Sequence, residues 1–463
     1  MTRVFISGPG RVIAVLILAL FVSLAAMHAA WAQDDDAVSL NSRRLIFAGQ
    51  EDARAALQWL RERGRPDAAA AMIMAFRYSD LDRAELAEAL AELTGDPPHE
   101  SWFDWMLWQQ AHPEVTPHPS FAALKLELLM HIDPQFSRFI QPGAPMDIRI
   151  EEVTWGGVRV DGIPALTNPK LIPAGAAGKL LPEEPVFGVE INGDARAYPL
   201  RFMDWHEMFN DVIGGVPVSL AYCTLCGAGI LFDTTVAGRD TPFTFGSSGL
   251  LYRSNKVMYD HQTDSLWNQF TGKPVSGPLL GTGIELKVLP VAITRWDDWV
   301  ARHPDTKVLA FETGYTRDYR PGRPYGTYFA SDELMFPAAL DDPALREKDV
   351  VFGVRTAGGA KAWPLAAFAG GRVINDRVGF NDVVLIGDAD TRSVRAYARD
   401  GQDFAAGADA TTLTAEGATW RVTEDALVSA DGTRLQRLPG HLAYWFAWAG
   451  YLGDEAEYSE VSQ

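Results

Sequence analysis

The sequence predicts a mainly β protein of the α+β class, in which two tandem, related β-rich domains follow a small all-α region. Apolar residues recur at helical spacing over 39–140, and short β-branched runs between turn residues follow that segment. A block of motifs occurs twice in the β-rich part. The expected bounds are 148–315 for the first β-rich repeat and 345–455 for the second.

Residues 1–32 have the pattern of a cleavable secretory signal peptide. Arg3 and Arg11 precede an apolar run that begins at Val12, and Ala30-Trp31-Ala32 is the small-x-small pattern that signal peptidase cleaves. The apolar run is shorter than the roughly 20 residues of a membrane span, so cleavage is favoured over an uncleaved anchor. We therefore expect a periplasmic or secreted protein with no stable membrane insertion after cleavage.

The charge balance restricts the partners. The chain has 41 Lys and Arg residues against 60 Asp and Glu residues, and loss of Arg3 and Arg11 with the leader takes the net charge to about −21. A surface of this sign repels nucleic acid and anionic lipid, so we expect no nucleic-acid partner. The charge selects neither a small-molecule nor a protein partner.

The helical region is expected to consist of short helices joined by turns. Ala56 and Leu60 lie one helical turn apart, as do Leu86 and Leu90, and prolines such as Pro97-Pro98 interrupt the pattern. The tryptophans that follow are most simply interpreted as helix-packing core.

An internal repeat runs through the β-rich part at a constant offset. Its shared motifs are Val186-Phe187-Gly188-Val189, Ala195-Arg196-Ala197-Tyr198-Pro199-Leu200 and Asn210-Asp211, matched by Val351-Phe352-Gly353-Val354, Ala360-Lys361-Ala362-Trp363-Pro364-Leu365 and Asn375-Asp376. Residues present in both copies are best explained by folding, because the same skeleton needs them twice. Residues present in one copy are candidates for chemistry.

The first copy alone carries chemistry-bearing residues at two aligned places. Trp205-His206-Glu207 stands where the second copy has Gly370-Gly371-Arg372, and the segment from Cys223 to Cys226 stands where the second copy has Asp388 to Thr391. The segment 243–271 also has little counterpart later in the sequence. We therefore expect the first repeat to perform the function and the second to be a degenerate, supporting copy.

Cys223 and Cys226 are the only two cysteines, and they lie at an expected strand-to-strand turn that is followed by Gly227. Such a turn resembles one half of a metal-binding knuckle, because it aims both sulfurs at one point. His206 is the best third ligand, and Glu207 is expected to orient it, to act as a base or to ligate directly. Two thiolates and an imidazole favour a transition metal ion (copper, zinc or iron) over Mg or Ca.

Residues Met258 to His261 offer further functional groups within 243–271. With Glu207, Tyr259 and Asp260 are the expected catalytic residues, in the first or second shell of the site. The alternative for Asp260 is a structural one, in which it pins the segment to the sheet.

Two other interpretations of the cysteine pair remain open. The pair is a catalytic or sensing dithiol in the first, which makes the protein a periplasmic thiol-disulfide enzyme or sensor. No helix signal follows Cys226, unlike in thioredoxin-type sites, where the first cysteine caps a helix. In the second interpretation the pair forms a structural disulfide within a non-catalytic binding module.

Several motifs accompany these residues: Asp161-Gly162-Ile163-Pro164-Ala165, Tyr198-Pro199-Leu200-Arg201, Trp205-His206-Glu207, Asn210-Asp211, Tyr222-Cys223-Thr224-Leu225-Cys226-Gly227, Ser248-Gly249-Leu250, Met258-Tyr259-Asp260 and Thr263-Asp264-Ser265-Leu266-Trp267. Together they resemble the bacterial family known as domain of unknown function 3179, over roughly Ile148 to Tyr451. His261 departs from the family pattern, in which Arg is expected. The resemblance supports the choice of residues and implies no particular reaction.

Overall fold

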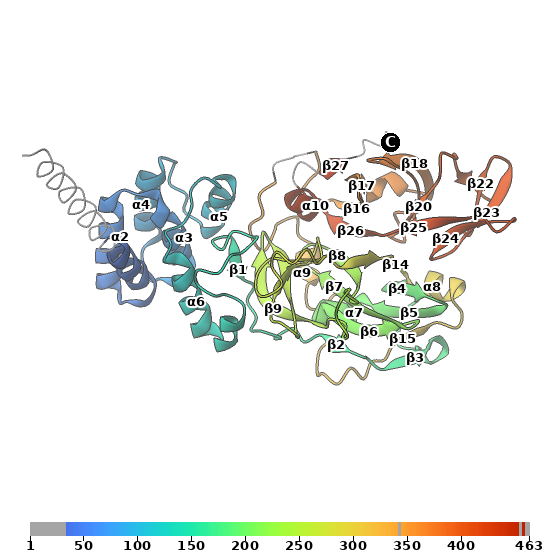
Figure 1. Ribbon diagram of the computed structural model, residues 1–463, viewed down its shortest axis with the longest axis horizontal. Coiled ribbons are helices and arrows are strands. Elements are labelled where there is room, and N and C mark those ends of the chain that lie inside the picture. The colour runs from blue at the N-terminus through green and yellow to red at the C-terminus, as the bar shows by residue number, and fades with distance from the viewer. Residues whose placement is uncertain (1–33, 341–343, 453–455, 459–463) are drawn as a thin grey trace, which may run out of the picture. The chain divides into compact units, whose positions relative to one another are not determined.

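Residues 34–340, 344–452 and 456–458 are described by a computed structural model, and the expected signal peptide lies outside them (Figure 1). The chain divides into two units, Met1–Leu128 and Leu129–Gln463, which are described separately. Within the described ranges, none of the helices has the length and apolarity that a bilayer crossing requires.

The first unit is helical, as predicted. A helix covers 34–47, and the later helices are α2 (Gln50–Arg63), α3 (Ala69–Tyr78), α4 (Arg83–Thr94), α5 (Trp102–Ala111) and α6 (Phe121–Ile132), the last of which reaches into the second unit. Local signals set their ends. The Asp82 carboxylate caps the first turn of α4, and Gly64 ends α2 in the left-handed conformation. Trp105 and Trp108 pack edge to face in the core of this unit.

The first half of the second unit contains three five-stranded sheets, with strand orders β14-β4-β5-β15-β3, β13-β8-β7-β6-β2 and β1-β9-β10-β11-β12. Their strands are β1 (Val153–Trp155), β2 (Leu166–Thr167), β3 (Leu171–Pro173), β4 (Pro185–Ile191), β5 (Asp194–Pro199), β6 (Met208–Ile213), β7 (Val216–Cys223), β8 (Ala228–Asp233), β9 (Phe245–Tyr252), β10 (Asn255–Asp260), β11 (Leu266–Asn268), β12 (Lys273–Pro274), β13 (Lys287–Leu289), β14 (Ala292–Arg295) and β15 (Lys307–Leu309). The short helices are α7 (Leu200–His206), α8 (Trp296–Arg302) and α9 (Gly326–Phe329).

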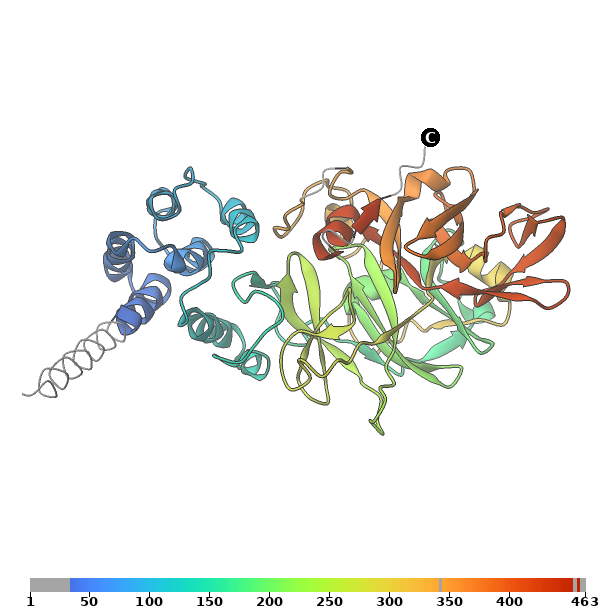
Figure 2. The ribbon, with the colours of Figure 1, turned by 45° about the horizontal axis from the view of Figure 1, so that its top comes forward.

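The second half contains a four-stranded sheet, β26-β16-β17-β27, and an eight-stranded sheet, β18-β19-β20-β25-β24-β23-β22-β21. The strands are β16 (Val350–Thr356), β17 (Gly359–Pro364), β18 (Arg372–Val378), β19 (Asn381–Asp388), β20 (Ser393–Ala398), β21 (Ala405–Ala406), β22 (Thr412–Ala415), β23 (Ala418–Val422), β24 (Ala426–Ser429), β25 (Arg434–Leu438), β26 (Gly440–Tyr444) and β27 (Ala456–Tyr458), and β26 leads into helix α10 (Trp445–Leu452). These strands, orange to red, lie alongside the green strands of the first half (Figures 1 and 2).

The two halves use the same strand arrangement around their leading hairpins. The hairpin β4–β5 has an antiparallel neighbour, β14, and a parallel neighbour, β15; the hairpin β16–β17 has β26 and β27 in the same places. In each half, a tryptophan of the helix that follows the antiparallel neighbour packs on the first strand of the hairpin. A Cβ atom at Gly188 would overlap the ring of Trp299, and one at Gly353 would overlap the ring of Trp448, so both glycines are required by close packing.

The two Asn-Asp motifs make equivalent hydrogen bonds in the two halves. Asn210 binds the backbone of Phe245 through both ends of its amide, at 2.9 and 3.0 Å, and Asn375 binds the backbone of Phe404 in the same way, at 2.8 and 2.9 Å. The neighbouring aspartates accept hydrogen bonds from the aromatic residue of the hairpin. These contacts fix loops to sheets, as expected for residues that serve folding.

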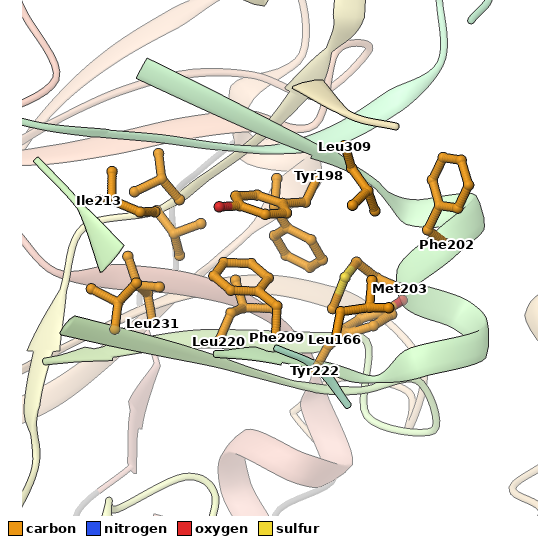
Figure 3. Packing of buried hydrophobic residues seen from close by; sticks show 14 residues of the cluster. Leu166, Tyr198, Phe202, Met203, Phe209, Ile213, Leu220, Tyr222, Leu231 and Leu309 are labelled. Atoms are coloured by element: carbon orange, nitrogen blue, oxygen red, sulfur yellow. The ribbon is translucent and has the colours of Figure 1, made fainter. Parts of the chain in front are cut away.

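The core of the first half lies between its sheets. Figure 3 shows Tyr198 of β5 facing Phe209 of β6, with Phe202 and Met203 of α7 closing one side. The rings of Tyr198 and Phe209 stack at 3.8 Å. The same cluster contains Tyr222 of β7, the strand that carries Cys223.

The segment 243–271, whose residues have little counterpart later in the sequence, stands at a point of the strand order where the second half also has strands. It supplies most of β9–β12, which form a separate sheet with β1, whereas the second half has β21–β24 at the same point of the chain, between β20 and β25. Those strands extend an existing sheet instead of forming a new one. Sequence comparison at a fixed offset missed this because the two segments differ in length and residues.

Candidate functional site

Cys223 and Cys226 lie on the turn that joins β7 to β8. The backbone N–H of Cys226 donates to Cys223 O at 3.2 Å, and Gly227 adopts the left-handed conformation with φ 61°. This turn brings the two Sγ atoms to 2.9 Å from each other. Both are free thiols, and their exposed fractions are 2% and 0%.

The sulfur of Cys226 contacts the tip of the β9–β10 hairpin. It lies 3.2 Å from Asn255 Oδ1 and 3.6 Å from Ser254 O. Burial raises the pKa of the Cys226 thiol well above its usual range, and the hydrogen bond with Cys223 and the charge of Glu207 act in the same direction. The backbone N–H of Lys256 opposes them. Cys226 is therefore protonated at rest.

A buried ion pair stands beside the cysteine turn. Lys256 Nζ lies 2.9 Å from Glu207 Oε2, while Glu207 Oε1 accepts from Thr224 Oγ1 at 3.0 Å and from the Tyr325 hydroxyl at 3.3 Å. Glu207 is 7% exposed and Lys256 is 4% exposed. Removing two charges from water is costly, and these extra hydrogen bonds offset part of that cost. Through Thr224, the ion pair is coupled directly to the turn between the cysteines.

Asp204, on α7, is a second buried carboxyl group near the cysteine turn. Its Oδ1 atom is buried without a hydrogen-bond partner in the part of the chain that is described. Burial, followed by the charge of Glu207, raises the pKa of Asp204 to about 8, and a hydrogen bond from Tyr222 opposes the shift. Asp204 therefore holds a proton at neutral pH, next to the residue that precedes Cys223.

His206 uses both ring nitrogens in contacts with residues other than the cysteines. Nδ1 lies 2.8 Å from Pro164 O, which only accepts, so Nδ1 carries the proton and Nε2 accepts from the Tyr319 hydroxyl at 2.7 Å. Burial lowers the pKa of His206. Over 34–340, 344–452 and 456–458, no group of three or more His, Cys, Asp and Glu side chains is arranged to hold a metal ion. His206 and the two cysteines do not form such a group.

Residues 313–331, here named the cover segment, lie over the site. Consecutive residues of the Trp205-His206-Glu207 motif each bind it: Trp205 Nε1 donates to Asp318 O at 2.8 Å, His206 binds Tyr319, and Glu207 binds Tyr325. The Tyr328 hydroxyl donates to Leu225 O, within the cysteine turn, at 2.7 Å. The motif is thus the docking site of the cover segment.

Elements from the second half complete the enclosure. The backbone N–H of Tyr444 donates to Cys226 O at 2.7 Å, and Lys348 Nζ lies 3.7 Å from the centre of the Tyr328 ring while binding Tyr328 O and Ser331 O. Several tyrosines have a raised pKa, for which burial is the largest cause and the neighbouring cysteines are a further one; they include Tyr325, Tyr328, Tyr444 and Tyr451. Aromatic side chains from both halves therefore surround the sulfur pair.

Comparison with protein families identifies the group to which these residues belong. The family model described as Protein of unknown function (DUF3179) matches residues 160–455. The chain belongs to the DUF3179 family. The match contains the cysteine turn, the Glu207–Lys256 pair and the cover segment, and it starts after the helical unit. No curated protein and no solved structure matches the chain.

Two residues of the DUF3179 motifs that were expected to be catalytic make other contacts. The Tyr259 hydroxyl donates to Asp161 Oδ2 at 2.5 Å, and the Arg138 guanidinium lies over its ring at 5.0 Å. Asp260 is fully buried and accepts from Thr263 N at 2.6 Å and from Trp267 Nε1 at 2.8 Å. These hydrogen bonds fix the loop after β10. They fit the structural role that is the alternative for Asp260. No hydrogen bond joins either side chain to the cysteine turn in the described residues.

The sequence reasoning missed several residues of the site. Asp204 and Thr224 were detectable, because alanine stands at both aligned positions of the second half, Ala369 and Ala389. Lys256 and Asn255 carried no such signal, since their strand has a different length in the two halves. The cover segment lies between the predicted repeats and was assigned to neither in full.

Proposed function

We propose that this DUF3179 protein is an exported thiol-disulfide redox protein, in which Cys223 and Cys226 interconvert between a dithiol and a disulfide. The observation that carries the proposal is the 2.9 Å separation of the two Sγ atoms at one turn, beside a buried ion pair. Oxidation removes two electrons and two protons from the pair. A partner disulfide accepts them and becomes two thiols, so the exchange needs no other reagent.

The two cysteines are assigned different steps. Cys223 Sγ has no hydrogen-bond partner except Cys226 among the described residues, whereas Cys226 is held by the hairpin tip. The Cys223 thiolate attacks the partner disulfide, forms a mixed disulfide and releases one partner thiol. The Cys226 thiolate then attacks the Cys223 sulfur, the internal disulfide forms, and the second partner sulfur leaves and takes up a proton.

The ion pair sets the resting state of the second step. Burial and the Glu207 charge keep Cys226 protonated, so it does not attack before a mixed disulfide is in place. Lys256 balances the Glu207 charge at 2.9 Å and limits this effect. Glu207 is thus assigned an electrostatic and positioning role in this proposal.

The second candidate is a metal-handling function with copper, zinc or iron. Two soft sulfur ligands at one turn support it. Because His206 binds Pro164 and Tyr319, the set contributed by the turn consists of two thiolates, which suit a soft ion such as Cu(I) better than zinc, which takes four ligands. A third candidate is a structural disulfide that locks the turn in a non-catalytic binding module.

We also propose that the second unit contains a tandem repeat, with the site in the first copy. The equal strand order around β4–β5 and β16–β17 and the equal Asn210 and Asn375 contacts support this origin. Tyr444 supports a surviving role for the second copy, because its backbone binds Cys226 O. Export rests on the sequence of residues 1–32.

One preparation tests all three candidates. The protein is expressed with its leader, purified from the periplasm and equilibrated with glutathione redox buffers, and thiols are counted by alkylation and mass spectrometry. Reversible oxidation with a midpoint between about −120 and −270 mV supports the redox proposal, whereas a bond that resists reduction below about −300 mV identifies a structural disulfide. Elemental analysis beside Cys223→Ser/Cys226→Ser identifies a metal site if bound metal is stoichiometric and lost in the variant.

A further inference from the structure

Asn255 is delivered to the cysteine pair by a strained turn. The β9–β10 hairpin turns over Arg253 and Ser254, whose φ values of 47° and 63° are both left-handed. The β22–β23 hairpin has the same two-residue turn over Glu416 and Gly417, with φ 51° and 79°. The β9–β10 turn therefore has serine at a left-handed position that glycine fills in the β22–β23 turn, and such strain is concentrated at functional sites.

The two ends of the Asn255 amide have different partners. Oδ1 accepts from Cys226 Sγ at 3.2 Å, whereas Nδ2 has no hydrogen-bond partner in the part of the chain that is described. The residue is 0% exposed. A buried donor without a partner is rare in native proteins, because its interaction with water is lost and not replaced. The donor is thus available, at no further desolvation cost, to a group that acquires negative charge.

We propose that Asn255 is a catalytic residue of the thiol-disulfide exchange proposed above, on which this inference rests. Its side-chain oxygen accepts from the neutral thiol of Cys226, and after rotation about the Cβ–Cγ bond its Nδ2 donates to the thiolate. An amide is suited to both states because it contains an acceptor and a donor.

The assigned step is the closing of the internal disulfide. Cys226 loses its proton to solvent, its thiolate attacks Cys223 Sγ in the mixed disulfide, and the bond between Cys223 and the partner sulfur breaks. The partner sulfur leaves with the electron pair and is protonated by solvent.

The test separates the two steps with dithiobis-nitrobenzoate, which releases a coloured thiolate when Cys223 forms the mixed disulfide and again when Cys226 closes it. We expect Asn255→Ala to slow the second release about tenfold, the effect of one hydrogen bond to a charged group, with the first release unchanged. Asn255→Asp keeps the volume but loses the donor, so it should slow the second release as well. Ser254→Ala, in the same turn, is the matched control, because only the backbone of Ser254 contacts Cys226.

The rates of the two releases decide whether Asn255 takes part in closing the disulfide. A second release at the wild-type rate in both Asn255 variants overturns the role of Asn255 and leaves the redox proposal standing. Equal slowing of both releases also overturns it, because that pattern indicates a displaced turn. If the wild-type protein gives a single release with no internal closure, the proposed exchange is wrong and the assignment of Asn255 falls with it.

Discussion

Lys256 Nζ lies 2.9 Å from Glu207 Oε2, and both side chains are buried against the turn that carries Cys223 and Cys226. The two residues come from different elements, because Glu207 directly follows α7 and Lys256 belongs to β10. Their pairing therefore joins α7 to the hairpin that contacts Cys226. Removing one partner of the ion pair leaves an uncompensated charge in the interior, which destabilises the folded protein.

Lys256→Met should destabilise the protein by about 3 to 5 kcal/mol, because the Glu207 carboxylate stays buried without its counter-charge. The double variant Glu207→Gln/Lys256→Met should recover most of that loss. Urea unfolding followed by circular dichroism gives both free energies. The exposed pair Lys170–Glu312, at 3.7 Å, is the control, and Lys170→Met should change stability by less than about 1 kcal/mol. A double variant as unstable as the single one would contradict the pairing.

Glu207→Gln should lower the pKa of Cys226, because the Glu207 charge is one of the causes that raise it. The ultraviolet absorbance of the thiolate, followed against pH in a Cys223→Ser background, measures the shift. In the parent, the raised pKa adds stability that is present below the unfolded thiol value of about 8.5 and is lost as pH rises through the folded value. If the Cys226 thiol titrates at the same pH in Glu207→Gln as in the parent, the Glu207 charge has no effect on its pKa.

The sequence correctly predicted the α+β class, the helical first unit and the DUF3179 family. It did not predict where His206 points. Helix α7 ends at His206, and Glu207 adopts the left-handed conformation with φ 52°, so the two consecutive side chains diverge. Glycine usually marks such an end, and a glutamate in that position gives no local signal.

Strand alternation explains why Tyr259 and Asp260 make contacts away from the cysteine turn. Successive side chains on a strand face opposite sides, so Met258, Tyr259 and Asp260 could not all face one site. The register of β10 also shifts between Val257 and Met258, which resets the alternation relative to Asn255 and Lys256. A bulge of this kind depends on pairing with β9 and is not visible in the residue order.

Asp204→Asn should make the protein more stable than the parent as pH rises from about 4 to 8. The folded pKa of Asp204 is raised to about 8, so the parent retains a proton that the unfolded chain releases and loses stability across that window. Asparagine has no proton to lose. The difference between the two unfolding free energies should grow by as much as about 1.4 kcal/mol per pH unit. Equal pH profiles for the two proteins would contradict the buried neutral acid.

Tyr319→Phe tests whether the Trp205-His206-Glu207 motif holds the cover segment closed. The change removes only the hydroxyl that binds His206 Nε2 at 2.7 Å and Thr313 Oγ1 at 2.7 Å. Loss of about 1 kcal/mol of closing free energy should raise the first-step rate with dithiobis-nitrobenzoate about fivefold and make 313–331 more sensitive to limited proteolysis. Tyr315→Phe is the matched control, because Tyr315 lies in the same segment and is 44% exposed. If Tyr319→Phe lowers bound metal without changing thiol access or proteolysis, the docking role is wrong and His206 regains its place as a ligand.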